Sequence, residues 1–427
     1  MPNMPLATAP TRLRNCYHAV LAKPMAGKTK SLVFDQASRP FALYLHWPFC
    51  RAKCPYCDFN SHVSNDVDTK IFGDALCTEM THMASLMRSR PPVSSLFFGG
   101  GTPSLMPPIL VERLIRHAED LFGFTNDIEI TAEANPTSVE AEAMLGFRKA
   151  GVNRVSMGVQ SLDDASLKFL GREHSAADAL QALDKVNKAF DRVSIDLIYA
   201  LPNQSQKAWK AMLGQALSLE LGHLSLYQLT IETGTVFHTR QRRGEVMALD
   251  DDRAADLYEM TQQMTNAAGL PSYEISNHAA LGQECRHNLT YWQAGDWLGV
   301  GPGAHGRFAL FDQAKNLAIR NAIVTRRNPA GWLDAVATKG HGIDKTQINS
   351  PADWASEMLM MGLRLKNGID LGVIENLCGP SDDWLYGSGV EQAIEAGWLQ
   401  RMPNQSTLMA SDDGRLRLNH ILSTILR

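Results

Sequence analysis

The chain lacks the features that define several large classes of protein. Its 427 residues contain only seven cysteines, too few for a disulfide scaffold. No apolar run approaches the ~20 residues that a membrane-spanning helix needs. The net charge of −4 gives no basic face for general nucleic-acid binding. The remaining composition, 44% hydrophobic and 20% charged, is typical of a globular protein with one large domain and a smaller one.

Acidic residues are nearly absent from residues 1–40. Asp35 stands alone against six lysines and arginines, and no apolar core of a secretory signal is present. Such a leader is compatible with a mitochondrial transit peptide, but serine is scarce and the amphipathic pattern is poor. A disordered extension of a bacterial protein is therefore the favoured interpretation. The two alternatives predict a bacterial cytoplasmic protein or, in a eukaryote, a protein of the mitochondrial matrix.

From residue 41 to 270, β-rich runs alternate with stretches of helical spacing. The expected strands are residues 41–46, 95–98, 128–132, 154–158, 192–198 and 223–229. The expected helices are residues 108–121, 138–150, 176–190 and 207–219. Units of a strand followed by a helix predict an α/β fold with a parallel sheet. The pattern alone leaves a doubly wound sheet and a barrel open.

Polar or glycine-rich residues follow or close the successive strands, and their positions favour the barrel. They are Cys50, the run from Gly99 to Thr102, Glu133, Gln160, Asp196, Gln228 and Thr230. A barrel builds its active face from the carboxyl ends of many strands. The crevice of a doubly wound sheet draws on fewer strands. We therefore predict that residues 41–270 form a barrel.

The sequence changes character after residue 270. Residues 271–345 form an expected connecting region that contains Cys285 and the run His287-Asn288-Leu289-Thr290-Tyr291-Trp292. Residues 346–427 are expected to form a smaller helical domain of winged-helix type. Its expected elements are helices at 353–365, 382–396 and 415–426 and a β-wing at 398–408. Because it has no basic recognition helix, we interpret it as a packing or partner module.

Three of the cysteines form the run Cys50-x3-Cys54-x2-Cys57. Cysteine thiolates are the usual ligands of iron–sulfur clusters, and three of them can hold a [4Fe–4S] cubane whose fourth iron stays open. A zinc site is the alternative, but structural zinc sites use four ligands, usually in two Cys-x2-Cys pairs. No second pair exists in the chain. The triplet therefore predicts a [4Fe–4S] cluster.

The cysteine spacing, with Tyr44 six residues before it and Phe59 two residues after it, resembles the radical S-adenosylmethionine (SAM) superfamily. The resemblance implies a partial, TIM-like (β/α)6 barrel. It also implies that SAM chelates the open iron and that an electron from the cluster splits SAM. The protein then supplies binding, orientation and shielding.

Further positions match, in order, the SAM contacts of the coproporphyrinogen-dehydrogenase branch of this superfamily. Gly99-Gly100-Gly101-Thr102-Pro103 is not a phosphate loop, because no Gly-Lys-Ser/Thr follows it. Each of the other positions, taken alone, could equally be a helix cap or a surface charge. Together the resemblance implies these SAM-binding residues: Tyr44, Gly100, Gly101, Thr102, Glu133, Gln160, Arg172 and Asp196. Carboxylates suit the ribose hydroxyls and the SAM ammonium group, and an arginine suits the SAM carboxylate.

Two departures select a branch of the superfamily. The oxygen-independent coproporphyrinogen dehydrogenases carry a fourth cysteine where this chain has Phe59. The run His287-Asn288-x2-Tyr291-Trp292 resembles instead the signature of HemW, the heme-chaperone branch. The resemblance implies a protein that binds heme and passes it to respiratory-chain proteins. The alternative is an enzyme that converts coproporphyrinogen III to protoporphyrinogen IX by SAM-dependent oxidative decarboxylation, an activity that we do not expect.

His287 is the candidate heme ligand, because a neutral imidazole is a good axial ligand and Tyr291 and Trp292 could flank a macrocycle. A structural role, in which His287 caps backbone groups of a loop, is the alternative. Cys285 is a second candidate ligand, and His305 is open between a ligand role and a turn.

The remaining predictions concern partners and the other cysteines. We expect an electron donor for the cluster and no nucleic acid, and we leave contact with a membrane surface and a homodimer open. Cys16, Cys77 and Cys378 are expected to be ordinary cysteines, the last two buried in helices.

Overall fold

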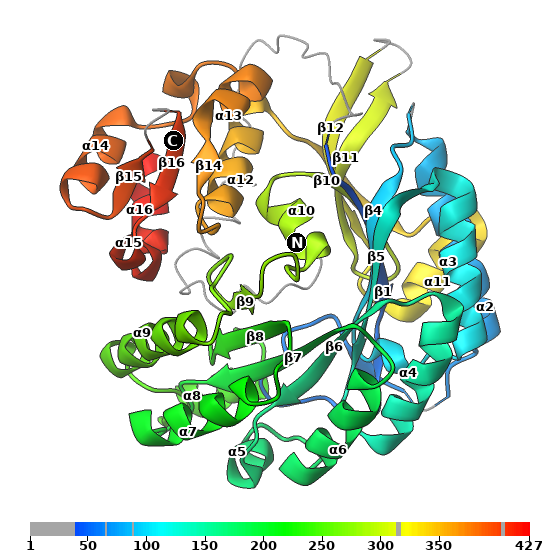
Figure 1. The fold of residues 1–427 in the computed structure, drawn as a ribbon. Helices are drawn as coiled ribbons and strands as arrows, with labels where there is room; N and C mark the ends of the chain where they lie inside the picture. The colour runs from blue at the N-terminus through cyan, green and yellow to red at the C-terminus, as the bar shows by residue number, and fades with distance from the viewer. Residues whose placement is uncertain (1–38, 65, 88, 313–316, 403–405) are drawn as a thin grey trace.

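The computed structural model describes residues 39–427 except residues 65, 88, 313–316 and 403–405. Nearly all of the predicted N-terminal extension, with Cys16, lies outside the described residues. The described chain forms a large curved sheet with helices on its convex side, and a helical C-terminal part fills the open side of the curve (Figure 1).

Six parallel strands form the centre of the sheet, in the order in which they follow one another along the chain. They are β1 (Phe41–Trp47), β4 (Val93–Gly100), β5 (Phe124–Ala134), β6 (Arg154–Gln160), β7 (Arg192–Tyr199) and β8 (His223–Gln228). All six predicted strands are confirmed. Because successive parallel strands are neighbours, special residues at their carboxyl ends gather at one mouth.

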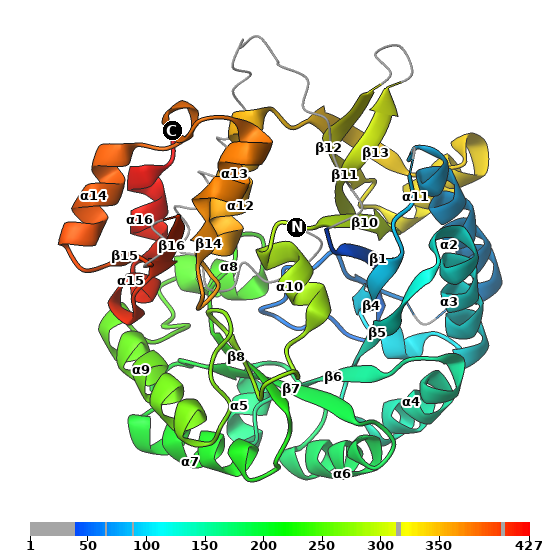
Figure 2. The same cartoon turned by 45° about the horizontal axis from the view of Figure 1, so that its top comes forward.

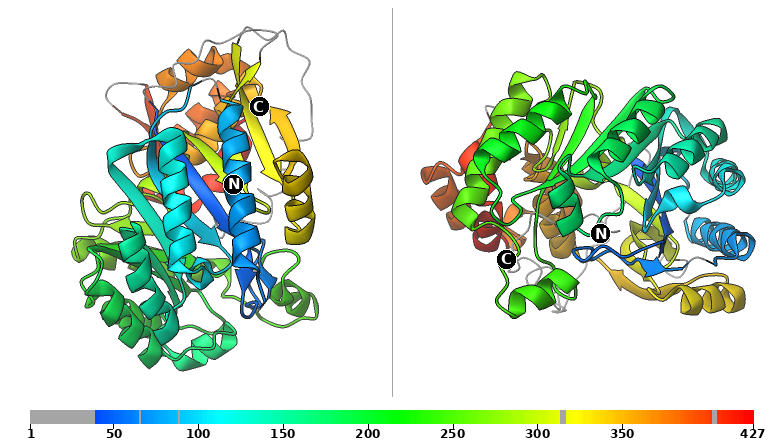
Figure 3. Two further views of the ribbon diagram at one scale, coloured as in Figure 1. Left: turned by 90° about the vertical axis from the view of Figure 1, so that its right-hand side faces the viewer. Right: turned by 90° about the horizontal axis from the view of Figure 1, so that it is seen from below.

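Further strands extend the sheet at both edges. At one edge the order is β10 (Asp296–Val300), parallel to β1, and then the antiparallel β11 (His305–Asp312), β12 (Leu317–Thr325) and β13 (Ile343–Ile348). At the other edge, β9 (Asn277–Ala279) pairs antiparallel with β8. The strand order ends at β13 and β9, so the sheet is an open arc (Figures 1 and 3). The predicted partial barrel is confirmed.

Helices cover the convex face of the arc (Figures 1 and 2). They are α2 (Thr69–Ser85), α3 (Pro108–Phe122), α4 (Ser138–Ala150), α5 (Asp164–Phe169), α6 (Ala176–Asn187), α7 (Gln206–Leu217), α9 (Asp251–Ala267) and α11 (Pro329–Lys339). Helix α8 (Val236–Arg242) lies instead beside the cysteine loop, where Phe237 N donates to Pro55 O (3.1 Å). The four helices predicted in the barrel are confirmed. Ser175 and Asp178 form a capping box at the start of α6, and Gly151, in the left-handed region, ends α4. No helix in the described part of the chain is long and apolar enough to cross a membrane.

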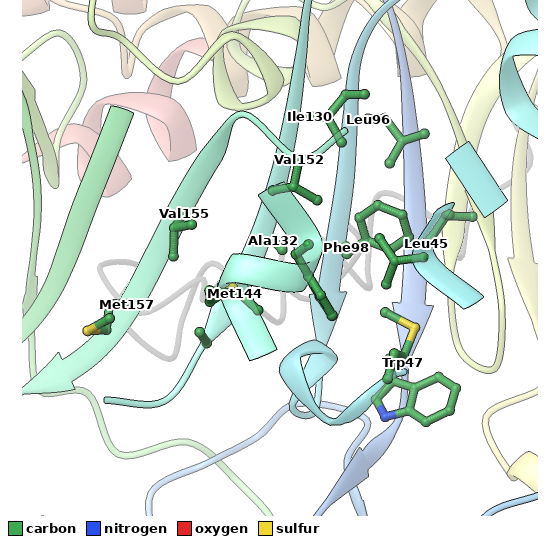
Figure 4. Close-up of a cluster of buried hydrophobic side chains, with 14 of the residues drawn as sticks. Leu45, Trp47, Leu96, Phe98, Ile130, Ala132, Met144, Val152, Val155 and Met157 are labelled. Carbon is green, nitrogen blue, oxygen red and sulfur yellow. The ribbon is translucent and has the colours of Figure 1, made fainter. Parts of the chain in front are cut away.

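The central strands divide their side chains between two faces. Leu96 and Phe98 on β4 and Val155 and Met157 on β6 point outward, toward helix residues such as Met144 (Figure 4). Burial of these apolar side chains is the main stabilisation of the helix layer. The alternate positions of the same strands face the concave side, and they include the polar residues Ser95 on β4 and Arg154 and Ser156 on β6. The concave face is therefore the place where chemistry can occur.

The C-terminal part has an apolar cluster of its own, which includes Trp354, Leu359, Ile374 and Ile421. Its helices are α12 (Pro351–Gly362), α13 (Leu371–Cys378), α14 (Gly387–Glu395), α15 (Asp412–Leu416) and α16 (Leu418–Ile425). β14 (Ile369–Asp370), β16 (Thr407–Ala410) and β15 (Leu399–Arg401) form a three-stranded sheet in that order. Helix α14 begins five residues later than predicted, because the 3-10 turn η3 (Ser381–Asp383) precedes it.

Helix α10 (Arg286–Trp292) lies inside the concave face (Figures 1 and 2). The carboxylate of Glu129 on β5 accepts hydrogen bonds from the backbone N–H groups of Arg286 (3.2 Å) and His287 (3.1 Å). It also accepts a bond of 2.7 Å from Arg192 on β7. Because Glu129 and Arg192 lie below the carboxyl ends of their strands, α10 forms a floor beneath the mouth of the barrel.

Candidate functional site

A cavity of about 270 Å³ opens at the carboxyl ends of the parallel strands. Its wall contains all three cysteines of the triplet and six of the predicted SAM-binding residues. These wall residues are Cys50, Cys54, Cys57, Gly101, Thr102, Glu133, Gln160, Arg172 and Asp196. Tyr44 and Gly100 lie behind the wall, and His287 lies in the floor. The structure thus brings most of the predicted site residues to one place.

The cysteine loop begins at the end of β2 (Phe49–Cys50), which pairs with β3 (His62–Val63). Each sulfur has a polar neighbour. Thr102 Oγ1 donates to Cys50 Sγ (3.3 Å), Arg172 Nη1 donates to Cys54 Sγ (3.4 Å), and Ser61 Oγ lies 3.8 Å from Cys57 Sγ. These neighbours can stabilise negative charge on the sulfurs.

Burial makes the free thiolates costly. It raises the pKa of the Cys57 thiol to about 11 and also raises the pKa of Cys50. Among the residues that the structure describes, no three His, Cys, Asp or Glu side chains are close enough to hold a single metal ion. The donor set itself, three thiols on one wall with a donor beside each, fits a larger iron–sulfur group whose positive charge would offset the thiolates.

The glycine run packs directly against the cysteine loop. Its backbone N–H groups are already used: Gly100 donates to Glu133 Oε2 (3.1 Å), Gly101 to Trp47 O (2.7 Å) and Thr102 to Phe49 O (2.9 Å). A Cβ atom on Gly100, whose φ is +118°, would come within 2.4 Å of the His46 ring. Glycine is therefore required here for close packing that holds the cysteine loop.

Two carboxylates share the cavity wall at the ends of β5 and β7. Burial and the charge of Asp196 raise the pKa of Glu133 to about 8, against the lowering effect of the Gly100 N–H group. Burial likewise raises the pKa of Asp196, although Ser156 Oγ donates to it (3.1 Å). A positively charged ligand between the two carboxylates would relieve this repulsion.

Arg172 is fixed at the wall by three acceptors. Nη1 donates to Cys54 Sγ, and Nη2 donates to Asn135 Oδ1 (2.6 Å) and Gly158 O (3.0 Å). Its buried Nε–H has no partner among the described residues. Arg172 lines the cavity, so its fixed guanidinium can attract a ligand carboxylate.

Gln160 is positioned by the local backbone, and Tyr44 is positioned by His46. Gln160 has a φ of +67° at a bulge that ends β6, a conformation that is unusual for a non-glycine residue. The hydroxyl of Tyr44 is 3.0 Å from His46 Nδ1, and His46 Nε2 donates to Asn60 O (2.9 Å). Tyr44 therefore supports the cysteine loop from behind the cavity wall.

The candidate heme ligands lie apart from this cavity. Both ring nitrogens of His287 are hydrogen-bonded, Nδ1 to Ser95 Oγ (3.1 Å) and Nε2 to the Tyr291 hydroxyl (2.6 Å). Burial, with Arg154 nearby, lowers the pKa of His287 to about 3. The thiol of Cys285 donates to Glu129 Oε1 (3.5 Å), and burial raises its pKa to about 12.

His305 begins β11, where its backbone packs against Gly299. Burial lowers the pKa of its side chain well below the usual value. Cys77 in α2 and Cys378 in α13 are buried in helices, as predicted.

Sequence reasoning missed residues that connect the predicted ones. Asn135 and Glu140 line the same cavity, and Asn135 contacts both Arg172 and Thr102. Glu129, the main partner of the α10 backbone, was also missed. Asn135 stands two residues after Glu133, so its nearness to the site could have been inferred, but its partners could not.

Comparison with known proteins places these features in a family. The model of the radical SAM superfamily matches residues 44–216. The heme chaperone HemW of Haemophilus influenzae is 34% identical over 398 residues, which cover 91% of this chain and 98% of that protein. The mitochondrial radical S-adenosyl methionine domain-containing protein 1 of Mus musculus is 41% identical over 336 residues, 78% of this chain and 75% of that protein.

The fold also matches a solved structure. Coproporphyrinogen III oxidase (HemN) from Escherichia coli superimposes with a TM-score of 0.75 over 98% of this chain and 96% of that chain, at 20% sequence identity. At this identity the likeness concerns the fold alone.

The barrel, the cysteine triplet and the cavity define a protein of the radical SAM superfamily. Within that superfamily, the chain belongs to the family of HemW and its mitochondrial relatives.

Proposed function

We propose that this chain is a heme chaperone that binds heme and passes it to respiratory-chain proteins, and that it carries a [4Fe–4S] cluster and SAM in the mouth of its barrel. The observation that carries the proposal is 34% sequence identity with bacterial HemW heme chaperones over a region that covers 91% of the chain. The chain's departure from the dehydrogenase pattern at Phe59 agrees with it.

Cys50, Cys54 and Cys57 would hold the cluster, with Thr102, Arg172 and Ser61 beside their sulfurs. When bound, such a cluster supplies the electron for reductive cleavage of SAM. The chain just before the cysteine loop is anchored by the Gly101 and Thr102 amides, which donate to Trp47 O and Phe49 O.

The cavity offers matched charges for SAM. Glu133 and Asp196 suit its ammonium group and ribose hydroxyls, and the positive charge of Arg172 suits its carboxylate. Gln160, Gly101 and Thr102 also line the cavity. Tyr44 and Gly100 do not line it but pack behind the residues that do.

The cavity charge favours a carrier over a porphyrinogen decarboxylase. Six acidic residues line it: Asp58, Glu133, Glu140, Glu173, Asp196 and Glu232. Against them stand Arg51, Lys53 and Arg172, of which Arg172 is committed to the cysteine loop. A substrate with several propionate groups needs clustered cations, so the lining is a poor match for it.

We retain His287 as the proposed heme ligand. In the described conformation an axial bond requires His287 to break its bond to Tyr291 or to Ser95. Heme binding would therefore include a movement of α10 or of the His287 side chain, with Cys285 and His305 as the other candidates.

The compartment and the partners also remain proposals. We propose the bacterial cytoplasm or the mitochondrial matrix, because relatives of both kinds are known. An electron donor must reach the cluster from the open mouth. Contact with a membrane surface and a homodimer are further proposals.

A paired assay separates the carrier from the enzyme. We expect the full chain to bind heme stoichiometrically, and His287→Ala to weaken that binding while about four irons per chain stay bound. The cysteine loop keeps its anchors in this variant, so iron content is the internal control. We also expect no conversion of coproporphyrinogen III with SAM under anaerobic reducing conditions. Steady formation of protoporphyrinogen IX, with heme binding unaffected by His287→Ala, would favour the enzyme instead.

A further inference from the structure

Asn135 and Glu140 connect the hydrogen-bond donors of two different cysteines. Asn135 follows β5 and Glu140 lies in the first turn of α4, where it is 3% exposed. Asn135 Oδ1 accepts from Arg172 Nη2 (2.6 Å), and Asn135 Nδ2 donates to Thr102 Oγ1 (3.4 Å). Arg172 contacts Cys54, and Thr102 contacts Cys50. The Asn135 amide thus contacts the hydrogen-bond donors of both the Cys50 and the Cys54 sulfurs.

Glu140 fixes which way this amide points. Its carboxylate accepts from Ser104 Oγ, from Asn135 N (2.7 Å) and from Asn135 Nδ2 (3.4 Å). A carboxylate only accepts hydrogen bonds, so the amide must turn its NH2 group toward Glu140 and its oxygen toward Arg172. The reverse orientation would place two acceptors, or two donors, against each other.

The orientation of the Asn135 amide directs the hydrogen bonds that Thr102 and Arg172 donate to the cysteine sulfurs. Thr102 has a single hydroxyl hydrogen. Because its oxygen already accepts from Asn135, that hydrogen is free for Cys50 Sγ. At Arg172, bonds from Nη2 to Asn135 and to Gly158 O fix the guanidinium plane, which directs Nη1 at Cys54 Sγ.

We propose that Asn135, held by Glu140, is a positioning residue that directs hydrogen bonds onto two of the three cluster sulfurs and so raises the reduction potential of the cluster. The inference rests on the proposed cluster. Hydrogen bonds to the sulfurs stabilise the more negative, reduced state, and they are one of the factors that set the potential of an iron–sulfur centre. Outer-shell groups of this kind orient the ligands without touching the metal.

The test compares three variants of the full chain after anaerobic reconstitution. Asn135→Ala removes both bonds, and Glu140→Gln lets the amide reverse. Asn153→Ala is the matched control: Asn153 also makes two bonds of 2.8 Å, to Ile130 N and Ile128 O, but it does not line the cavity. The readouts are iron content, thermal stability and the midpoint potential from a redox titration followed by electron paramagnetic resonance.

We expect Asn135→Ala to retain about four irons per chain and to lower the equilibrium constant for reduction about tenfold, which is 59 mV for a one-electron couple. Glu140→Gln should lower it in the same direction by less, and Asn153→Ala should lose stability without a change in potential. If Asn135→Ala cannot retain iron, the midpoint potential of Glu140→Gln tests the inference instead. A wild-type potential in these cavity variants at full iron content overturns the inference. A wild-type chain that takes up no iron overturns the proposed cluster as well.

Discussion

The mouth and the floor of the barrel are built from the same strands but satisfy their polar groups differently. At the floor, Glu129 accepts four hydrogen bonds and both nitrogens of His287 are occupied. At the mouth, Arg172 has a free Nε–H, and Glu133 and Asp196 repel each other. The polar groups of Glu129 and His287 at the floor are thus paired, whereas the mouth lacks a charged partner. The contrast indicates where a ligand adds stability and where a substitution removes it.

The largest expected effect is loss of the cluster. Cys54→Ser should hold less than one iron per chain after anaerobic reconstitution, because a tightly held cubane needs all three thiolates of the loop. Iron analysis and the brown absorption of the protein measure this. Cys378→Ser, a buried cysteine far from the mouth, is the control and should keep about four irons. A full cluster in Cys54→Ser would remove the basis for the mouth as a metal site.

The floor should respond to a single substitution with a large loss of stability. Glu129→Gln leaves Arg192 without its buried anionic partner, which typically costs about 3–5 kcal/mol. Denaturant unfolding of the cluster-free chain measures the change. Glu112→Gln breaks the exposed pair with Arg116 and should cost less than about 0.5 kcal/mol. Equal losses of stability in the two variants would mean that the buried contacts of Glu129 do not stabilise the floor more than an exposed ion pair does.

The residues of the mouth could be predicted from the sequence better than those of the floor, for a physical reason. The strands were predictable from their apolar runs, and Cys50, Gly101 and Glu133 from motifs at the strand ends. The contacts of Glu129 reach a residue 63 positions away at Arg192 and 156 positions away at Cys285. No local pattern encodes such pairings. The partners of the glycine-run amides are likewise distant in sequence: Gly100 donates to Glu133, and Gly101 donates to Trp47 O.

A smaller effect is expected on SAM affinity. Arg172→Ala removes a cation from the cavity wall, and losing one charge-assisted contact costs about 1.5–3 kcal/mol, roughly ten- to a hundredfold in Kd. Calorimetry on reconstituted protein measures it. Because Arg172 also contacts Cys54, iron content must be determined alongside. Arg116→Ala, on the exposed face of α3, is the control and should bind SAM as wild type does. Unchanged affinity in Arg172→Ala at full iron content would place the SAM carboxylate elsewhere.

The smallest expected effect is a pH dependence that belongs to the mouth alone. The pKa of Glu133 is raised to about 8, so this carboxyl is mostly protonated at neutral pH in the ligand-free protein. A raised folded-state pKa means that the folded state holds the proton more tightly than the unfolded state, so the contribution of Glu133 to stability falls as pH rises from its unfolded value of 4.5 through 8. The ammonium group of SAM needs the ionised carboxylate.

SAM affinity should therefore rise with pH, by up to about tenfold between pH 6 and pH 7, where the α-amino group of SAM keeps its charge, because binding at the lower pH must first remove the proton from Glu133. Calorimetry across this range, in two buffers of different ionisation enthalpy, also counts the proton released. Glu133→Gln should bind SAM more weakly and lose the slope, whereas Glu142→Gln, exposed on α4, should keep it. A slope that survives in Glu133→Gln would assign the titration to another group, and the repulsion between Glu133 and Asp196 would then not control ligand binding at the mouth.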